Sequence, residues 1–408
     1  MENPKIRFKG FTKDWEQRKL NEVAEKICVG FVGTCEKFYT DESGIPMYRT
    51  GNLNGLSLNR DDLKYVTNEF HQHNQKSQLK AGDILIARHG DSGKAVNYEN
   101  SEEANCLNIV IIRPDFKKCN YKFLTNCINS PECQKHIKSL SAGSTQAVIN
   151  TSEIEKLGVV IPANIDEQNR IARYFSTLDN LITLHQRKCE QTKKLKKYML
   201  QKMFPRNGAK VPEIRFDGFT YDWEQRKFSE LVTIERGGSP RPIDKFITND
   251  ENGLNWVKIG DAPEQGNYIT QTAEKIRPEG LSKTREVHPG DLILSNSMSF
   301  GRPYIMAIDG CIHDGWLAIR DTKKNFDLKF LCTLLGTDGM LNQYKAMAAG
   351  STVNNLNKEL VGGTTVAFPM VEEQIKIGDY FTTLDHLITL HQRQTDFYKK
   401  PNFYFISS

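Results

Sequence analysis

The sequence predicts an α/β protein of mixed α+β content, built from two repeats of one unit that each end in a long helix. The hexapeptide DWEQRK occurs at residues 14–19 and again at 222–227, within stretches that are identical at 13 of 18 positions. Further stretches match in the same order at offsets of 206 to 208 residues, and heptad-like apolar spacing closes each repeat. We therefore expect two globules separated by two long antiparallel helices, which form a coiled-coil spacer with pseudo-twofold symmetry.

The ends of the repeats are similar and their middles differ. GDILIARHGDSGK (82–94) aligns with GDLILSNSMSFGR (290–302), and the segment AGST recurs at 142–145 and 349–352. The segments 38–74 and 246–279 share little beyond their general pattern. A constant frame that carries two different inserts predicts two similar scaffolds with different surfaces.

Each middle segment alternates short apolar runs with Gly, Asn and Asp. This pattern predicts strands at 83–87, 107–113, 291–295 and 315–320. Polar helices are expected at 122–140 and 328–347. Pro162 and Pro369 then mark the end of each globule.

A helix with an apolar stripe is predicted after each of these prolines. Its spaced positions are Ile171, Phe175, Leu178 and Ile182 in the first copy, and Ile377, Phe381, Leu384 and Ile388 in the second. An apolar stripe needs a partner in water, so the two stripes are expected to pack against each other. The alternative is that each helix packs on its own globule. His185 and His391 continue the stripes as a polar notch.

The predicted boundaries are a first globule at 1–163, a first spacer helix at 164–206, a second globule at 207–370 and a second spacer helix at 371–400. Residues 401–408 form an atypical tail with the apolar cluster Phe403, Tyr404, Phe405 and Ile406. Because Pro401 takes the place of Leu195, the second helix should end near Lys399 and lack about ten residues of the first. The far end of the first helix, at 196–204, is therefore expected to be partly unsupported.

Composition excludes several classes of protein. The 408 residues contain no apolar run long enough for a membrane span, and the N-terminus has no apolar signal core, so a cytoplasmic location without a membrane partner is expected. Nine cysteines without a C-x-x-C pair disfavour a zinc ribbon or a thioredoxin-type site. The net charge of +5 permits a nucleic-acid partner, and residues 166–204 alone carry nine Lys or Arg against four Asp or Glu.

No catalytic motif is found. The chain lacks a G-x-x-x-x-G-K-[ST] loop, a G-x-G-x-x-G turn after a strand, and a D-P-P-Y or N-P-P-F stretch. The pair His71 and His73 is interpreted as part of a surface turn, not a metal site. We expect a protein without an active site, a metal or a bound cofactor of its own. The alternatives are a stand-alone DNA methyltransferase or nuclease, or a pure protein-interaction scaffold.

Polar and cationic residues gather in loops at matching positions of the two repeats. Arg and Lys can read guanine and Asn and Gln can read adenine, while Ser and Thr can hold phosphates. For any single residue a solvated loop is the simpler interpretation, so the hypothesis rests on the set. The candidate DNA-binding residues are Arg49, Asn52, Arg88, Ser92, Lys94, Ser144, Thr145, Gln146, Lys258, Ser295, Asn296, Arg302, Ser351, Thr352 and Asn354.

Over nearly its whole length the chain resembles the specificity (S) subunits of Type I restriction–modification enzymes. The resemblance rests on VVIPANIDEQNRIARYFSTLDNLI (159–182), its second copy VAFPMVEEQIKIGDYFTTLDHLI (366–388), and the repeated DWEQRK segment. It implies that each globule is a target recognition domain that reads one half of a bipartite sequence in double-stranded DNA. The helices would set the gap between half-sites.

The resemblance also implies the partners. Two methylation (M) subunits would bind the helices, and restriction (R) subunits would join through them. The S subunit would have no catalytic residues and no cofactor, so S-adenosylmethionine, ATP and Mg are expected on the partner subunits. Neutralising Lys94 or Arg302 is expected to weaken DNA binding.

Overall fold

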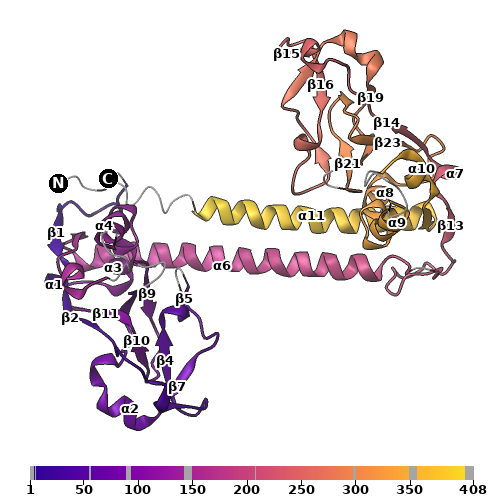
Figure 1. Ribbon diagram of the computed structural model, residues 1–408. Helices are drawn as coiled ribbons and strands as arrows, with labels where there is room; N and C mark the ends of the chain where they lie inside the picture. Colours follow the sequence, from indigo (N-terminus) through magenta and orange to yellow (C-terminus); the bar gives the residue numbers. More distant parts are fainter. Residues whose placement is uncertain are drawn as a thin grey trace. The chain divides into compact units, whose positions relative to one another are not determined.

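The computed structural model describes residues 4, 6–54, 57–88, 93–141, 149–206, 208–296, 300–348 and 356–399 (Figure 1). The chain divides into two compact units, Met1–Leu184 with Thr395–Ser408, and His185–Gln394. Each unit holds one globule and portions of two long helices, α6 (Ile165–Lys202) and α11 (Val371–Lys399). Within the described ranges, no helix is long and apolar enough to cross a membrane.

The first unit contains two four-stranded sheets. One has the order β2-β11-β8-β9 and the other β10-β4-β7-β3, and β1 pairs with β12 and β5 with β6. The strands are β1 (Trp15–Lys19), β2 (Ala24–Val29), β3 (Tyr39–Thr40), β4 (Ile45–Arg49), β5 (Leu53–Asn54), β6 (Ser57–Leu58), β7 (Lys64–Val66), β8 (Asp83–Ala87), β9 (Ala95–Tyr98), β10 (Asn105–Leu107), β11 (Ile109–Pro114) and β12 (Gly158–Pro162). The short helices are α1 (Leu20–Val23), α2 (Asn68–His73), α3 (Tyr121–Ile128), α4 (Pro131–Ser141) and α5 (Thr151–Ile154).

The second unit repeats this plan with two five-stranded sheets. Their orders are β14-β23-β20-β21-β17 and β15-β18-β16-β22-β19, and β13 pairs with β24. The strands are β13 (Glu224–Lys227), β14 (Thr233–Arg236), β15 (Ile247–Thr248), β16 (Leu254–Val257), β17 (Tyr268–Ile269), β18 (Glu274–Ile276), β19 (Arg285–Val287), β20 (Leu292–Ser295), β21 (Pro303–Met306), β22 (Gly310–Ile312), β23 (Trp316–Arg320) and β24 (Thr365–Phe368). The helices are α7 (Phe228–Leu231), α8 (Leu328–Leu335), α9 (Asp338–Ala348) and α10 (Lys358–Gly363). Figure 1 shows α8 and α9 beside the start of α11, with β15 and β16 at the far end of the globule.

The apolar run at 107–113 is not the single strand that its pattern predicts. Asn108 has a φ of 55°, in the left-handed region, and it separates β10 from β11. β10 pairs with β4 in one sheet, whereas β11 pairs with β2 and β8 in the other. The run divides at Asn108 for a steric reason, because a residue in the left-handed region cannot continue an extended strand.

In the structure, two shorter helices stand in place of each predicted polar helix. In place of 122–140 the chain forms α3 and α4, which are separated by two residues before Pro131. Proline disfavours helical geometry in the residue before it, so the first helix ends there. In place of 328–347 the chain forms α8 and α9, with Gly336 and Thr337 between them.

The repeated DWEQRK segment forms an edge strand that joins the beginning of each repeat to its end. β1 pairs antiparallel with β12, from Trp15 opposite Pro162 to Lys19 opposite Gly158. β13 pairs in the same way with β24, from Glu224 opposite Phe368 to Lys227 opposite Thr365. Both partner strands lead directly into a long helix, so the pairing sets where that helix leaves its globule.

The repeated Glu-Gln pair at the start of each long helix forms a buried clamp. Glu373 is 0% exposed and receives two hydrogen bonds from Arg215, with both N–O distances at 2.7 Å. Glu167 receives the same bidentate contact from Arg7, at 2.6 and 2.8 Å. Gln374 donates to the backbone oxygen of Pro369 at 2.9 Å. The clamp explains why these residues recur, since a buried carboxylate needs a cation with matching geometry.

In the second unit, α6 and α11 run antiparallel and in contact (Figure 1). Nδ1 of His185 lies 3.1 Å from Nδ1 of His391, and Nζ of Lys196 lies 2.5 Å from Oδ1 of Asp385. Along the contact the residue numbers of α6 rise while those of α11 fall, as antiparallel helices require. The predicted antiparallel pairing is therefore present in this unit.

The apolar stripes do not pack only on each other. Ile171, Phe175 and Leu178 are buried in the core of the first globule, and Ile377, Phe381 and Leu384 are buried in the core of the second. Ile182 and Ile388, one heptad step later, are half-buried. In the first turns of each helix the apolar stripe therefore packs against the globule of the same repeat. The sequence offered this packing as the alternative to pairing between the two stripes.

The far end of α6 is well supported, which corrects the expectation for 196–204. Met203 and Phe204 are buried among Trp223, Phe330 and Phe381. The expectation considered only the second helix as a support. The core of the second globule provides the support instead, because the chain turns directly from α6 into that globule. α11 is described as far as Lys399.

The histidine pair predicts a pH dependence of stability. Burial, followed by the charges of His391 and Lys188, lowers the pKa of His185 below its ordinary value of 6.5. The unfolded chain then binds more protons than the folded chain, so stability is present above about pH 6.5 and is lost as the pH falls through the lowered value.

We expect the double variant His185→Leu, His391→Leu to flatten the loss of thermal stability between about pH 7 and pH 5. His386→Leu is the matched control, because this exposed histidine lies on α11, the helix that carries His391. Melting temperatures across that range check the prediction. An unchanged slope in the double variant would show that other groups cause the pH dependence.

Candidate nucleic-acid interface

The segment that follows the central strand of each globule is anchored in the same way in both units. Ile149 donates its backbone N–H to the carbonyl of Arg88 at 3.3 Å, and Leu356 does the same to Asn296 at 3.0 Å. The guanidinium of Arg88 also donates to the carbonyl of Ile149 at 3.3 Å. These residues therefore hold together two loops that lie far apart in the sequence.

Several predicted contact residues are buried, not exposed. Asn296 is 2% exposed and donates to the carbonyl of Asp314 at 2.8 Å. Ser295 is 0% exposed, and its hydroxyl accepts the backbone N–H of Arg302. The expectation that these side chains lie on the loop surface is corrected, because their polar groups serve the loop's own backbone.

Asn52 and its counterpart Asp261 close equivalent turns after β4 and β16. Oδ1 of Asn52 accepts the backbone N–H of Arg49 at 2.9 Å, and Oδ2 of Asp261 accepts that of Lys258 at 2.7 Å. Asn52 is 2% exposed, which again corrects the expected surface position. The neighbouring cations Arg49 and Lys258 remain half-exposed, and each pairs with a carboxylate. Arg49 lies 2.8 Å from Asp62, and Lys258 lies 2.5 Å from Glu274.

Lys94 and Arg302 occupy matching positions at the start of the next strand. Lys94 is exposed. Arg302 is half-buried, donates to the carbonyls of Glu264 at 2.8 Å and Gly266 at 3.2 Å, and lies 5.0 Å from the centre of the Tyr304 ring. Arg302 therefore supports a loop, whereas Lys94 presents its charge to solvent. Seven candidates lie outside the described residues: Ser92, Ser144, Thr145, Gln146, Ser351, Thr352 and Asn354.

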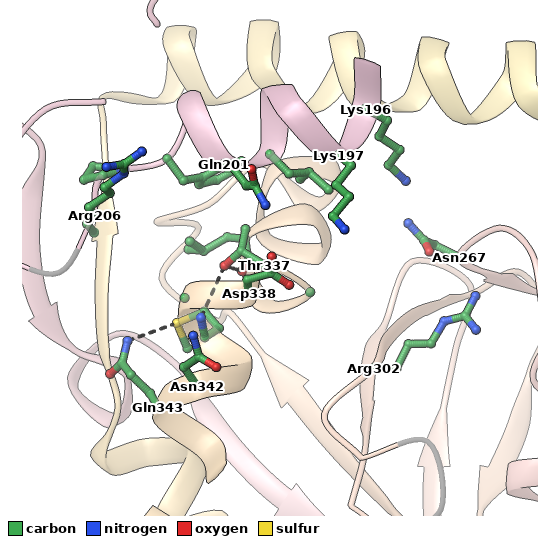
Figure 2. Close-up of a pocket in the computed structure, with 18 of the residues that line it drawn as sticks. Lys196, Lys197, Gln201, Arg206, Asn267, Arg302, Thr337, Asp338, Asn342 and Gln343 are labelled. Carbon is green, nitrogen blue, oxygen red and sulfur yellow. Dashed lines mark hydrogen bonds between the residues drawn. The ribbon is translucent and has the colours of Figure 1, made fainter. Parts of the chain in front are cut away.

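A basic cleft of about 1290 Å³ opens in the second unit between the end of α6 and the globule. Figure 2 shows Lys196, Lys197 and Gln201 projecting from α6 toward the side where Asn267 and Arg302 lie. The charged lining residues are Lys193, Lys196, Lys197, Arg206 and Arg302, with Glu264, Asp338 and Asp385 as the acidic ones. The five cations and three carboxylates give the lining of the cleft a net charge of +2.

The chemistry of the basic cleft suits phosphate oxygens. A hydrogen bond to Glu190 raises the pKa of Lys193, and the same contact pairs its ammonium group with a carboxylate at 3.0 Å. Lys197 is exposed, while the charge of Lys196 is matched by Asp385. Lysine ammonium groups and side-chain amides are common partners of a nucleic-acid backbone. Sequence reasoning missed this cleft, although the charge of residues 166–204 was a usable signal.

The structure gives no metal site in its described part. No group of three or more His, Cys, Asp or Glu side chains is placed there to hold an ion. His71 lies on α2, not in a surface turn as expected. It is 4% exposed, and its Nδ1 lies 2.6 Å from Oδ1 of Asn105.

Comparison with known proteins decides the family. Residues 12–194 and 221–396 both match the family described as Type I restriction modification DNA specificity domain. The chain belongs to this family. Among its relatives, the putative type I restriction enzyme MjaX specificity subunit of Methanocaldococcus jannaschii is 23% identical over 94% of this chain and 90% of that protein. The EcoBI specificity subunit of Escherichia coli is 23% identical over 40% of this chain and 34% of that protein.

Solved structures of Type I S subunits share this fold. The S subunit from M. genitalium superimposes with a TM-score of 0.65 over 99% of this chain and 98% of its own, at 15% identity. A chain from a study of complex assembly in the type I R-M system gives a TM-score of 0.50 over 97% of each chain, at 16% identity. The predicted mixed α/β fold with two specificity domains is confirmed. A specificity domain recognises DNA, which fits the exposed cations described above.

Proposed function

We propose that this chain is the non-catalytic, sequence-reading subunit of a Type I restriction–modification complex, in which each globule reads one half of a bipartite target in double-stranded DNA. The supporting observation is that the two units keep the same frame and differ in their sheets. Both sheets have four strands in the first unit and five in the second. The buried clamp and the β1–β12 or β13–β24 pair are common to both.

In this proposal α6 and α11 set the gap between the half-sites and dock two methylation subunits. Both helices carry apolar side chains that their own contacts leave exposed. In the second unit these include Leu195 at 45%, Tyr198 at 51% and Ile375 at 44%. Exposed apolar groups on a helix favour a protein partner. Restriction subunits would join through the methylation subunits.

The cofactors of the reaction belong, in the same proposal, to the partner subunits. S-adenosylmethionine would bind the methylation subunits, and ATP and Mg would serve the restriction subunits. The contribution of this chain is then positioning, because it selects where on DNA the partners act.

Coexpression with a methylation partner, followed by sequencing of methylated bases across the host genome, tests the proposal. A two-part motif with a fixed gap is the expected result. Methylation by this chain alone would favour the stand-alone methyltransferase. Equal binding of the assembled complex to every duplex would favour an interaction scaffold without sequence recognition.

Lys94 offers a local test of DNA contact. If its ammonium group contacts a base, Lys94→Gln should weaken binding of the assembled complex to its target by about 1–3 kcal/mol. If it contacts a phosphate, binding to all sequences should weaken alike and the salt dependence should become less steep. Affinity measured at several salt concentrations separates these cases, and no change in either quantity would exclude a contact.

Arg302 is less suitable for the same experiment. Its guanidinium holds the carbonyls of Glu264 and Gly266, so Arg302→Gln would also disturb a loop. Lys117→Gln is the matched control for Lys94, because Lys117 is an exposed lysine of the same unit outside the candidate loops.

A further inference from the structure

The two walls of the basic cleft in the second unit differ in chemistry. The end of α6 forms one wall, whose polar side chains are Lys193, Lys196, Lys197 and Gln201. The turn before β17 contributes to the other wall with Glu264, Gln265 and Asn267. Figure 2 shows Lys197 projecting from α6 and Asn267 from the globule into the same opening. Lysines thus line one side of the cleft, and a carboxylate with two amides lines the other.

Lys197 has its charge available for a ligand. The neighbouring lysine Lys193 lies 3.0 Å from the carboxylate of Glu190. Lys196 lies 2.5 Å from that of Asp385. Lys197 is exposed and takes part in none of the ion pairs formed in the described part of the chain. Because an ammonium group can bind a phosphate as a point charge, the α6 wall is suited to the backbone of a nucleic acid.

Arg302 holds the turn before β17 in a fixed conformation. Its guanidinium donates to the carbonyls of Glu264 at 2.8 Å and Gly266 at 3.2 Å. Beyond the turn, the backbone N–H of Ile305 donates to the carbonyl of Asn267 at 2.6 Å. The φ of Gly266 is 85°, in the left-handed region that glycine adopts without strain. A turn anchored in this way loses little conformational entropy when it binds a partner.

The side chains of this turn suit base edges better than phosphates. Gln265 is exposed and Asn267 is half-buried, and within the described residues neither side-chain amide forms a hydrogen bond. Asn and Gln side chains can pair with adenine in the major groove, and a carboxylate can accept a hydrogen bond from cytosine. The exposed carboxylate of Glu264 would repel a phosphate. The turn therefore fits the groove of a duplex, whereas the α6 wall fits the backbone beside that groove.

The same turn lies where the two units differ. The matching sheets β2-β11-β8-β9 and β14-β23-β20-β21-β17 differ by β17, the edge strand that follows the turn. In the described part of the first unit, the chain after β4 forms the hairpin β5–β6 instead. Arg302 supports the turn, whereas its repeat counterpart Lys94 is exposed. An element that differs between the units is suited to reading bases that differ between the half-sites.

We propose that the basic cleft receives the backbone of one DNA strand at the half-site of the second globule. Lys197 then contacts a phosphate from outside, and the turn enters the groove, where Gln265 and Asn267 contact base edges. Arg302 acts as a positioning residue for the turn. This inference rests on the proposed function and adds to it the residues that read the second half-site.

Sequencing of methylated bases in the coexpressed complex tests the turn. Asn267→Ala and Gln265→Ala should each relax one position of one half-site, with the preference for the original base pair lowered by about fivefold or more. The other half-site and the gap should stay unchanged. Arg302→Gln should relax the same position as Asn267→Ala, and the double variant should relax it no further. Asn252→Ala is the matched control, because Asn252 is an exposed asparagine of the same unit that does not line the cleft.

The salt dependence of DNA binding by the same complex tests the α6 wall. Lys197→Gln should weaken binding to all sequences alike and reduce the slope of log affinity against log salt by about 0.9, because one phosphate contact is lost. The methylated motif should stay the same. Lys194→Gln is the matched control, because Lys194 is an exposed lysine of α6 outside the lining of the cleft, and it should change neither quantity.

The outcomes separate this inference from the proposed function. An unmodified complex that methylates no two-part motif would remove the function itself. A two-part motif that both Asn267→Ala and Gln265→Ala leave unchanged would overturn the reading by the turn alone. An unchanged salt slope in Lys197→Gln would overturn the phosphate contact. If that variant instead weakened assembly with the methylation subunit, the cleft would belong to an acidic segment of that partner.

Discussion

Glu373→Ala is expected to lower the free energy of unfolding of the second unit by about 3–5 kcal/mol. The carboxylate is fully buried and binds Arg215 through two hydrogen bonds of 2.7 Å. Removing it leaves a guanidinium that is largely shielded from water without its counter-charge. The first turn of α11 would then lose its attachment to the segment that precedes β13. Chemical denaturation, together with hydrogen exchange of the β24 amides, checks the prediction.

Glu372→Ala is the matched control. This neighbouring glutamate is exposed in the same first turn, where its interaction with the helix dipole is worth about 0.3–1 kcal/mol. A loss of similar size in both variants would mean that the clamp contributes no more than an ordinary surface charge. The double variant Arg215→Met, Glu373→Leu should recover part of the loss, because it leaves no buried charge unpaired.

Exchange of the first globule is expected to change one half of the recognised DNA sequence and to leave the other half and the gap intact. The exchanged segment is 24–157, taken from a relative that keeps helices like α3 and α4. These boundaries preserve β1, α1, β12 and the clamp of Arg7 with Glu167. Each altered base pair costs about 1–3 kcal/mol, so affinity for the original target should fall by about fivefold or more per changed position.

Genome-wide mapping of methylated bases with the methylation partner present measures the outcome. The reciprocal exchange of 232–364, between α7 and β24, is the control and should alter the opposite half-site. A change in both half-sites after a single exchange would contradict independent reading by the two globules. A change in the gap alone would indicate that the exchanged segment affects the spacing set by the helices and not the bases that the globule reads.

The candidate site was only partly predictable, and Asn52 shows why. An Asn after a strand can read a base or cap a turn, and the sequence is the same in either case. Its 2% exposure and its bond to the backbone of Arg49 decide for the turn. Lys94 and Arg302 align perfectly in the repeat, yet only the structure separates an exposed cation from one that supports a loop. The basic cleft was missed because its lysines lie on a helix that the heptad pattern assigns to a spacer.

What the sequence determined by itself was the plan: two copies of one unit, the strand at 83–87, the strand predicted at 315–320 and formed at 316–320, and two long helices that begin after Pro162 and Pro369. These features follow from local periodicity and from the repeat, which a linear chain records directly. The tertiary structure alone decided that Asn108 sends one apolar run into two sheets and that Phe204 closes the second globule. Both outcomes depend on contacts between residues distant in the chain, and only the packed core selects among the conformations that local preference allows.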